Sequence, residues 1–489
     1  MFRQFKRPYR SNIWRHGLYY SCIVILFFLF MNIMAFQRNC ADLEGENNID
    51  PGGTTFVSNL GNGDIKNNVF QERKLNSRKS QKVVFKNKLR KLMDILESNL
   101  EKTFPNDAPE ISFEKYFPDR QLYCDDIANI SDMTYMASGW TKAVYKGLYK
   151  GTPVAIKTID VKGQDVTTCM STGMSQSACY VKAAKKIVKE IVILQALAGE
   201  NVLKVLGFCL PSNADDNQFV AMVTELGEAV DLIRLLQMSW EDRLKVCLDI
   251  TRIVDFMKRT PYGSMSMNDF RRQQFVLVRG NLKLSDVDDT EFEDPHCRNS
   301  NECDITFSSA NFSQKSLCQH RRCVQYNEKR NLFNAGRHFV TILLPHGAPL
   351  RLQPIINSVM NGYTNLTMTS EELLSQMNKI VTLYKSGWYL NRSKSISKHR
   401  LHYKKLEHTD LPGQYDYRCR LSLSMATCTV SVFDLQEAED LCNSDQDCKG
   451  FVVAQQTTWS GRHVIHLKNG IGAPSIRPNT TLYIKPTAL

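Results

Sequence analysis

From about residue 130 the secondary-structure patterns along the chain run mainly from strands to helices, and this order limits the folds that the chain can adopt. The stretch WTKAVYKGLYKGTPVAIKTID, residues 140–160, alternates as two strands of a hairpin with a turn at Lys150 and Gly151. Helical periodicity follows in residues 180–197 and again in residues 239–259. Because no internal repeat interrupts this order, we expect an α+β fold in which a helical lobe follows a strand-rich lobe.

An apolar segment, LYYSCIVILFFLFMNIMAF at residues 18–36, lies near the start of the chain. At about 1.5 Å per residue a helix of this length just spans a bilayer, and the basic residues within 1–17 would keep that end in the cytoplasm. Ala35 offers a cleavage site, so a signal anchor in the membrane and a cleaved signal peptide both remain open. A buried core helix is the alternative, which so apolar a terminal segment disfavours. We expect the remainder of the chain to lie in the secretory lumen.

Cysteine usage agrees with that oxidising compartment. Apart from Cys22 in the apolar segment, fourteen of the fifteen cysteines remain, and an even, clustered set favours disulfides. Zinc is the alternative for PHCRNSNEC and CQHRRC, but neither has the tight Cys-x-x-Cys spacing of common zinc modules. Cys209 and Cys247 have apolar neighbours, which is typical of buried thiols. Five sequons are usable there for N-glycosylation: Asn129, Asn311, Asn365, Asn391 and Asn479.

Composition predicts further boundaries. Residues 37–110 are polar and turn-rich and then basic, as in a flexible stem with one amphipathic helix that docks on the domain or pairs with a partner. A folded domain over 120–400 and a cysteine-containing module over 401–489 are expected to follow. The residues that recur at helical spacing in the stem are Leu89, Met93, Leu96 and Leu100.

The formal net charge of +12 does not make the chain a nucleic-acid-binding protein. Much of the excess lies in the basic head and in ERKLNSRKSQKVVFKNKLRK at residues 72–91. Such a run is usually a solvated face, and it can equally contact acidic lipid, glycan or a processing protease. We expect no nucleic-acid partner for the folded part.

The stretch NLKLSDVDDTEF, residues 281–292, is a strand-like run that ends in carboxylates, among them Asp286 and Asp288. Carboxylates at the end of a strand suit a hard cation such as Mg²⁺ or Mn²⁺. Three hypotheses fit this pattern: the Asp-x-Asp site of a Golgi glycosyltransferase at Asp286-Val287-Asp288, an altered Asp-Phe-Gly of a protein kinase, and a cap of the following turn.

A second pattern favours the kinase. MASGWTKAVYKG followed by VAIK resembles a protein-kinase glycine-rich loop and its lysine strand. A loop folded over a triphosphate needs small residues for close backbone approach, and a buried ammonium neutralises phosphate charge. Gly139 takes the place of the middle glycine, whereas Ala137 and Lys142 replace the outer glycines. The residues expected to contact ATP are Met136, Ala137, Gly139, Lys142, Val144 and Lys157.

The helix and loop that follow add to the kinase pattern. KEIVILQAL places Glu190 on a helix, where a kinase has the glutamate that holds the lysine. SMSMNDFRRQQFVLV resembles a catalytic loop in which Asp269 orients the substrate hydroxyl or accepts its proton. Arg271 matches the basic residue that stabilises the charge of the transferring phosphate. Taken singly, each residue is as well explained by a surface charge or a turn.

The spacing to the acidic run completes the constellation. Asp286 follows Asp269 by 17 residues, close to the usual kinase separation, and is the expected principal ligand of Mg²⁺ or Mn²⁺. Asp288 and Gln274, which stands where Asn normally holds a metal ion, are the expected helpers. Four elements in the right order and spacing are improbable by chance, and a glycosyltransferase explains only one of them.

Four stretches make the resemblance closer: SGWTKAVYKG, SWEDRLKVCL, RRQQFVLV and NEKRNLFNAGRHFVTILLPHGAP. They resemble the vertebrate lonesome kinase family of secreted tyrosine-protein kinases, from about residue 120 to the C-terminus. This resemblance implies a two-lobed kinase fold, use of ATP, residence in the Golgi lumen and secretion. It also implies tyrosine phosphorylation of secretory-pathway and extracellular matrix proteins, and roles in skeletal and organ development. The tyrosine specificity rests on the resemblance alone, because nothing in DFRRQQ is typical of a tyrosine-kinase loop.

Departures from the kinase pattern favour two further hypotheses. Met267 and Asn268 replace the usual His-Arg, so no arginine there awaits an activation-loop phosphate. We therefore predict constitutive activity, with the segment after Asp286 braced by its cysteines. The lost glycines and the altered Asp-Phe-Gly instead suggest a pseudokinase that binds partners. The bracing cysteines are Cys297, Cys303, Cys318 and Cys323, and the next core helix is expected around Asn331.

The last cysteine-containing stretch has its own pattern. In YRCRLSLSMATCTVSVFDLQEAEDLCNSDQDCKGFVV, a helix precedes CKGF, which enters a strand. This resembles the PAN/apple modules of secreted proteins, with Cys442 and Cys448 at the crossing from helix to strand. Binding of glycan or substrate protein and bracing of the helical lobe both remain open as its role.

Overall fold

The structure is a computed structural model that describes residues 80–94, 120–210, 219–307, 312–390, 402–411, 413–419 and 427–486. The chain divides into the units Met1–Val69 and Phe70–Leu489, and all described residues belong to the second. Within them, no helix is both long and apolar enough to cross a membrane. The predicted membrane segment, most of the stem, Leu96, Leu100, Asn311 and Asn391 lie outside the described residues.

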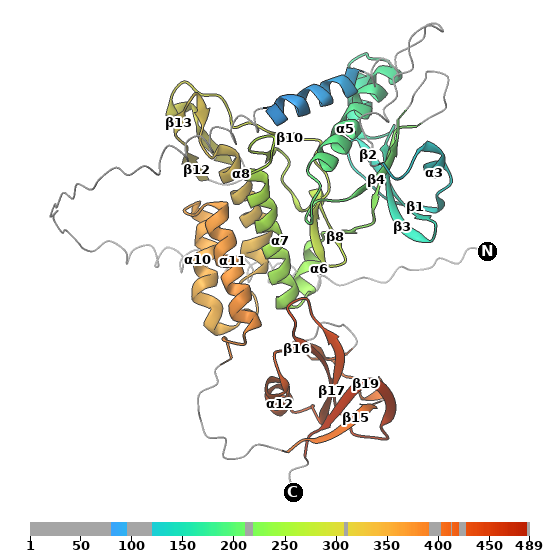
Figure 1. The fold of residues 1–489 in the computed structure, drawn as a ribbon, viewed down its shortest axis with the longest axis vertical. Coiled ribbons are helices and arrows are strands. Elements are labelled where there is room, and N and C mark those ends of the chain that lie inside the picture. Colours follow the sequence, from blue (N-terminus) through green and yellow to red (C-terminus); the bar gives the residue numbers. More distant parts are fainter. Residues whose placement is uncertain are drawn as a thin grey trace, which may run out of the picture. The chain divides into compact units, whose positions relative to one another are not determined.

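The strand-rich lobe is a five-stranded antiparallel sheet in the order β1-β2-β3-β5-β4 (Figure 1). The predicted hairpin turn is present, with Lys150 and Gly151 both at positive φ. Gly147 is required in β2, since a Cβ there would lie 2.4 Å from Ile130. The strands are β1 (Ser131–Ser138), β2 (Lys142–Tyr149), β3 (Thr152–Ile159), β4 (Val205–Cys209) and β5 (Ala221–Glu225).

One long helix, α5 (Gln176–Ala196), contacts this sheet and begins at Ser175, whose hydroxyl accepts from the Ala178 amide. Its apolar residues form a wide buried face that belongs to the main core, so hydrophobic burial fixes the helix against the sheet. The short helices α3 (Cys124–Ala128) and α4 (Gln164–Ser171) complete this lobe.

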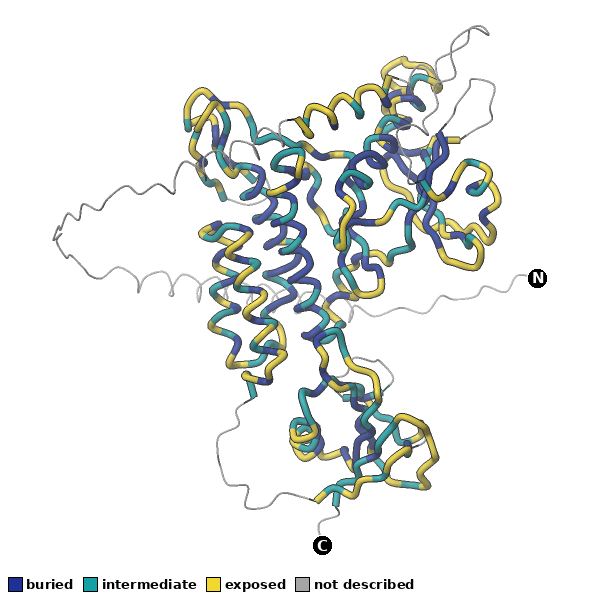
Figure 2. Tube along the Cα trace, in the orientation of Figure 1, coloured by how far each residue is buried: buried dark blue, intermediate teal, exposed yellow. Residues whose placement is uncertain are grey.

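The helical lobe forms around α7 (Trp240–Lys258), which is buried along nearly its whole length (Figure 2). In the middle of α7, the Thr251 hydroxyl lies 2.8 Å from the hydroxyl of Tyr363, which comes from another helix of this lobe. The expected helix around Asn331 is α8 (Tyr326–Ala335), which continues into the π-helical turn Gly336–Val340 and α9 (Thr341–Leu343). The remaining helices are α6 (Leu232–Gln237), α10 (Gln353–Asn365) and α11 (Ser370–Lys385).

Short strands lie next to α7, and the loops that connect them contain Asp269 and Asp286. One sheet has the order β6-β8-β9, and β7 pairs with β10. Two hairpins follow, β11-β12 and β13-β14. The strands are β6 (Glu228–Ala229), β7 (Ser266–Met267), β8 (Phe275–Val278), β9 (Asn281–Leu284), β10 (Thr290–Glu291), β11 (Asp304–Phe307), β12 (Phe312–Lys315), β13 (Cys318–Gln319) and β14 (Arg322–Cys323).

The C-terminal module is a five-stranded sheet, β15-β19-β17-β18-β16, with the helix α12 (Leu435–Ser444). It contacts α7 through Glu241, a carboxylate 2% exposed that accepts hydrogen bonds from the hydroxyls of Ser431, Thr458 and Ser460. The strands are β15 (Lys404–Asp410), β16 (Thr429–Val432), β17 (Gly450–Thr457), β18 (His463–Lys468) and β19 (Ser475–Ile484).

Twelve of the cysteines in the described residues form six disulfides, and those of PHCRNSNEC and CQHRRC form bridges rather than zinc sites, as predicted. The pairs are Cys124–Cys209, Cys169–Cys179, Cys297–Cys318, Cys303–Cys323, Cys419–Cys428 and Cys442–Cys448. The prediction of a buried thiol is confirmed for Cys247 and wrong for Cys209. Apolar neighbours surround a disulfide-bonded cysteine as readily as a free thiol, so they do not distinguish the two. The partner of Cys209 is Cys124, which reaches it because α3 contacts β4.

Candidate functional site

An ion pair between Lys157 and Glu190 lies at the centre of the candidate site. Lys157 is in β3, Glu190 is in α5, and their Nζ and Oε1 atoms are 2.6 Å apart. The Lys157 ammonium also donates to the backbone oxygen and the hydroxyl of Ser285, each at 3.1 Å. Both residues of the pair are buried, at 7% and 0% exposure, so the pair is little screened by water. This pair therefore joins the sheet, α5 and the end of β9.

A second lysine occupies the same cluster. Lys142, the first residue of β2, contacts Glu190, and its Nζ lies 2.9 Å from Asp286 Oδ1 and 3.0 Å from Asp288 Oδ2. Burial alone would lower the pKa of Lys142, but the surrounding carboxylates raise it well above its ordinary value. Lys142 therefore stays charged, and the position where kinases usually have an outer glycine carries a buried cation.

Three carboxylates converge around Lys142, with ligand oxygens of Glu190, Asp286 and Asp288 all within 4.8 Å of one another. Burial raises the pKa of Asp288 to about 6, and the Asp286 and Glu190 charges add to this shift while Lys142 opposes it. For Asp286 burial has the same raising effect, but Lys142 and Lys157 outweigh it and hold the pKa well below its usual range. Crowded carboxylate oxygens of this kind fit a hard divalent cation such as Mg²⁺ or Mn²⁺.

Asp269 and its neighbours form a second group. The Asp269 carboxylate pairs with Arg271 and accepts from Gln274 Nε2 at 2.7 Å. Gln274 also connects the two groups, because its backbone oxygen accepts from the amides of Ser285 at 2.9 Å and Asp286 at 3.1 Å. Gln274 thus links Asp269, through its side chain, to Asp286, through its backbone oxygen. The Gln274 amide bonds to Asp269 here, and its role as a metal ligand stays a prediction.

The loop expected to cover ATP is the turn between β1 and β2. Gly139 donates to the Lys142 backbone oxygen at 2.8 Å, and Ala137 pairs with Val144 across the hairpin. Met136 is 46% exposed, and a Cβ at Gly139 would meet no atom within 4 Å. The described residues therefore leave this face open, and none of them gives a steric reason for glycine at 139.

Three contributors were not predicted. Ser285 contacts the Lys157 ammonium, and its place just before the expected metal ligand was the available signal. Asn331 joins α8 to the catalytic loop, donating to the Met265 oxygen at 2.8 Å. His338 lies near Asp269, and burial together with nearby arginines lowers its pKa to about 4, which keeps the ring neutral at neutral pH. No motif marks the last two, because their partners are distant in sequence.

Three of the predicted sequons lie in the described residues. Asn129, Asn365 and Asn479 are all exposed, so each is accessible to a glycosyltransferase. Their use stays a prediction.

Comparisons with known proteins agree with this geometry. A family model described as the protein-kinase domain of FAM69 matches residues 184–363, which include Glu190, Asp269 and Asp286. The chain is also similar to the human protein "Extracellular tyrosine-protein kinase PKDCC", at 41% identity over 369 residues, which cover 75% of this chain and 74% of the relative. A glycosyltransferase accounts for neither match, and that alternative is left without support. The chain belongs to the family of protein kinases that includes this extracellular tyrosine kinase.

Proposed function

We propose that this chain is a secreted protein tyrosine kinase that transfers the γ-phosphate of ATP to tyrosines of proteins in the Golgi lumen and the extracellular space. The observation that carries the proposal is the Lys157–Glu190 pair closed on Ser285 beside the acidic cluster, since an assembled pair of this kind is required for phosphoryl transfer in protein kinases. The family relative is named as an extracellular kinase, and the disulfides suit that compartment. Matrix proteins as substrates, and roles in skeletal and organ development, belong to the proposal.

Each residue of the site has a proposed task. Lys157, oriented by Glu190, neutralises the α- and β-phosphates of ATP. Asp286, helped by Asp288 or Gln274, holds Mg²⁺ or Mn²⁺, which neutralises phosphate charge when bound. Asp269 orients the tyrosine hydroxyl and accepts its proton as the tyrosine oxygen bonds to the γ-phosphorus and the bond from that phosphorus to ADP breaks.

The remaining tasks concern the nucleotide and the transferred group. Arg271 stabilises the developing phosphate charge. Met136, Ala137, Gly139 and Val144 cover the nucleotide from the hairpin turn.

A pseudokinase is the second candidate, and Lys142 favours it. This lysine already forms ion pairs with Asp286 and Asp288, the two carboxylates that would hold the metal ion. If Lys142 were to keep that position, the chain would bind partners without transferring phosphate.

Transfer of labelled γ-phosphate separates the two candidates. The secreted chain should phosphorylate a tyrosine-containing secreted protein in the presence of ATP and Mn²⁺. Lys157→Met and Asp269→Ala should abolish incorporation, because they remove the phosphate-binding ammonium and the proton acceptor. Transfer that survives both substitutions, or wild-type chain that binds ATP and transfers nothing, would exclude the proposed kinase mechanism.

The Lys142 cluster gives a prediction that does not depend on activity. In EDTA, Lys142→Met should lower the free energy of unfolding by about 3–5 kcal/mol, because it removes the ammonium that pairs with Glu190, Asp286 and Asp288. Mn²⁺ should restore much of this loss, since a divalent cation can neutralise the same oxygens. Denaturant unfolding with and without Mn²⁺ measures both effects.

The matched control is Lys146→Met, an exposed lysine on the same strand. It should change stability little in either condition. If Lys142→Met were as stable as this control in EDTA, the assignment of Lys142 as the cation of the cluster would be wrong.

A further inference from the structure

The helix over residues 80–94, here called the stem helix, contacts the kinase domain through an aromatic cluster. Phe85 is 6% exposed and stacks on Tyr262, with ring centroids 4.2 Å apart. It also contacts Phe292 edge-on at 5.4 Å. Tyr262 in turn donates to the backbone oxygen of Ala196, at the end of α5. One side chain of the stem helix therefore touches both the segment after Asp286 and the loop next to α5.

Ion pairs reinforce this contact at Glu293, next to Phe292. Glu293 pairs with Lys82 at 2.7 Å and Lys86 at 2.6 Å, both on the stem helix. Arg322 of β14 approaches the other oxygen of the same carboxylate at 2.5 Å. Hydrogen bonds from Lys82 and Lys86, with a smaller contribution from Arg322, hold the pKa of Glu293 well below its usual range even though burial opposes this. A carboxylate surrounded by cations from two elements forms a network, which fixes its position better than an isolated surface pair does.

The same segment is fixed to the catalytic loop at its other end. Asn268 donates from its backbone amide to the Asp289 oxygen at 3.1 Å and from Nδ2 to the Asp289 carboxylate at 3.2 Å. Lys189 of α5 donates to the backbone oxygens of Asp288 at 2.6 Å and Thr290 at 3.2 Å. Residues 286–293 are therefore held at both ends, by α5 and the catalytic loop at one and by the stem helix at the other.

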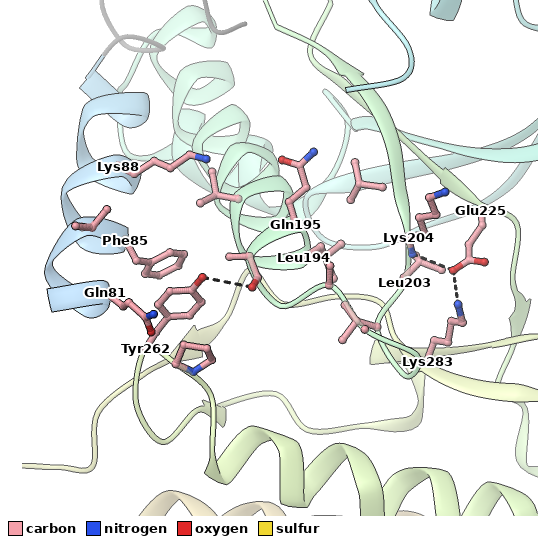
Figure 3. A pocket seen from close by; sticks show the side chains of 18 of the residues that line it. Gln81, Phe85, Lys88, Leu194, Gln195, Leu203, Lys204, Glu225, Tyr262 and Lys283 are labelled. Carbon is pink, nitrogen blue, oxygen red and sulfur yellow. Dashed lines mark hydrogen bonds and ion pairs between the residues drawn. The ribbon is translucent and has the colours of Figure 1, made fainter. Parts of the chain in front are cut away.

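The stem helix does not fill the space beneath it. A pocket of about 890 Å³ lies between it and the end of α5, lined by Val84, Phe85 and Lys88 on one side and by Leu194 and Gln195 on the other (Figure 3). Continuous packing is thus missing along part of the helix. The helix is therefore attached through the ion pairs of Glu293 and through four apolar residues that pack against the core, Phe85, Leu89, Leu92 and Met93.

We propose that Glu293 is a positioning residue for phosphoryl transfer, through which Lys82 and Lys86 of the stem helix hold residues 286–293 ready for a protein substrate. In many protein kinases a phosphate on this segment orders it by pairing with arginine. Here a carboxylate replaces the phosphate, and lysines of the stem helix with Arg322 replace the arginine that is missing at position 268. The segment needs no phosphorylation because its anion is permanent. The inference rests on the proposed kinase site, of which Asp286 begins this segment.

Three variants of the full secreted chain test the proposal. Glu293→Gln keeps the shape but removes the charge, and should lower kcat/KM for the tyrosine substrate about tenfold, the effect of about 1.4 kcal/mol. ATP affinity should stay unchanged, because Lys157 and Glu190 are untouched. The reversal Lys82→Glu/Lys86→Glu/Glu293→Lys should recover part of the transfer, because carboxylates on the stem helix then pair with the ammonium introduced at position 293. Glu291→Gln, an exposed carboxylate two residues away, is the matched control and should behave as wild type.

Ionic strength supplies a readout that a merely structural role would not give. The Glu293 pairs are partly exposed, so salt weakens them, and at about 1 M salt the Debye length is only about 3 Å. Wild-type transfer should then fall toward that of Glu293→Gln, while transfer by the variant should change little. Wild-type activity in Glu293→Gln, or a reversal variant that folds and binds ATP without recovering any transfer, would overturn the proposal. Failure of the wild type to bind ATP would instead count against the proposed kinase site.

Discussion

Asp269→Asn is expected to lower kcat for tyrosine phosphorylation by about 10²- to 10⁴-fold, the usual contribution of a positioned general base. Asparagine has the shape of aspartate and can still accept from Gln274, which donates to this position at 2.7 Å, so the loop should keep its geometry. It cannot take up the proton of the substrate hydroxyl. ATP affinity should therefore match the wild type, because Lys157 and Asp286 are unchanged. Steady-state phosphorylation with a tyrosine peptide, together with nucleotide titration, measures both quantities.

The matched control is Asp289→Asn, which alters another carboxylate beside the catalytic loop, one that accepts from Asn268. It should retain most of the activity. Full activity in Asp269→Asn would show that Asp269 is not the general base, and a parallel loss of ATP binding would show that its role is to maintain the fold of the loop.

Removal of the Cys124–Cys209 disulfide is expected to have the largest effect on stability among the bridges of the strand-rich lobe. Its cysteines are 85 residues apart, whereas those of Cys169–Cys179 are 10 apart. In the chain-entropy account, the longer loop contributes about 4–5 kcal/mol and the shorter one about 3 kcal/mol. The double variant Cys124→Ser/Cys209→Ser should accordingly have a lower denaturation midpoint than Cys169→Ser/Cys179→Ser. Equal losses would show that the bridges act through local contacts rather than through loop closure.

The sequence predicted the fold class and the central pair of the site because each rests on local chemistry. Lys157 follows a strand pattern, Glu190 lies on a periodic helix, and Asp286 ends an apolar strand, so each carries its own signal within a few residues. The separation of 17 residues between Asp269 and Asp286 also matched the usual kinase spacing. A kinase domain could be predicted from these four positions.

What could not be predicted depends on contacts between distant parts of the chain. Lys142 was recognised as a lost glycine, but its place among Glu190, Asp286 and Asp288 follows from the register of β2 and the position of α5. No sequence pattern marks Phe85, and its role follows only from its ring contacts with Tyr262 and Phe292 in the folded chain. Cys209 lacked a visible partner for the same reason. Contacts between residues that are distant in sequence depend on the packed fold, and no local sequence pattern predicts them.

The buried carboxylate of Glu241 bears on where the catalytic unit ends. The Glu241 carboxylate accepts hydrogen bonds from three hydroxyls of the C-terminal module, those of Ser431, Thr458 and Ser460. A chain ending near residue 400 would leave that charge on α7 without them, next to the core of the helical lobe. We therefore expect loss of the last ninety or so residues to destabilise the helical lobe before it affects recognition of a partner.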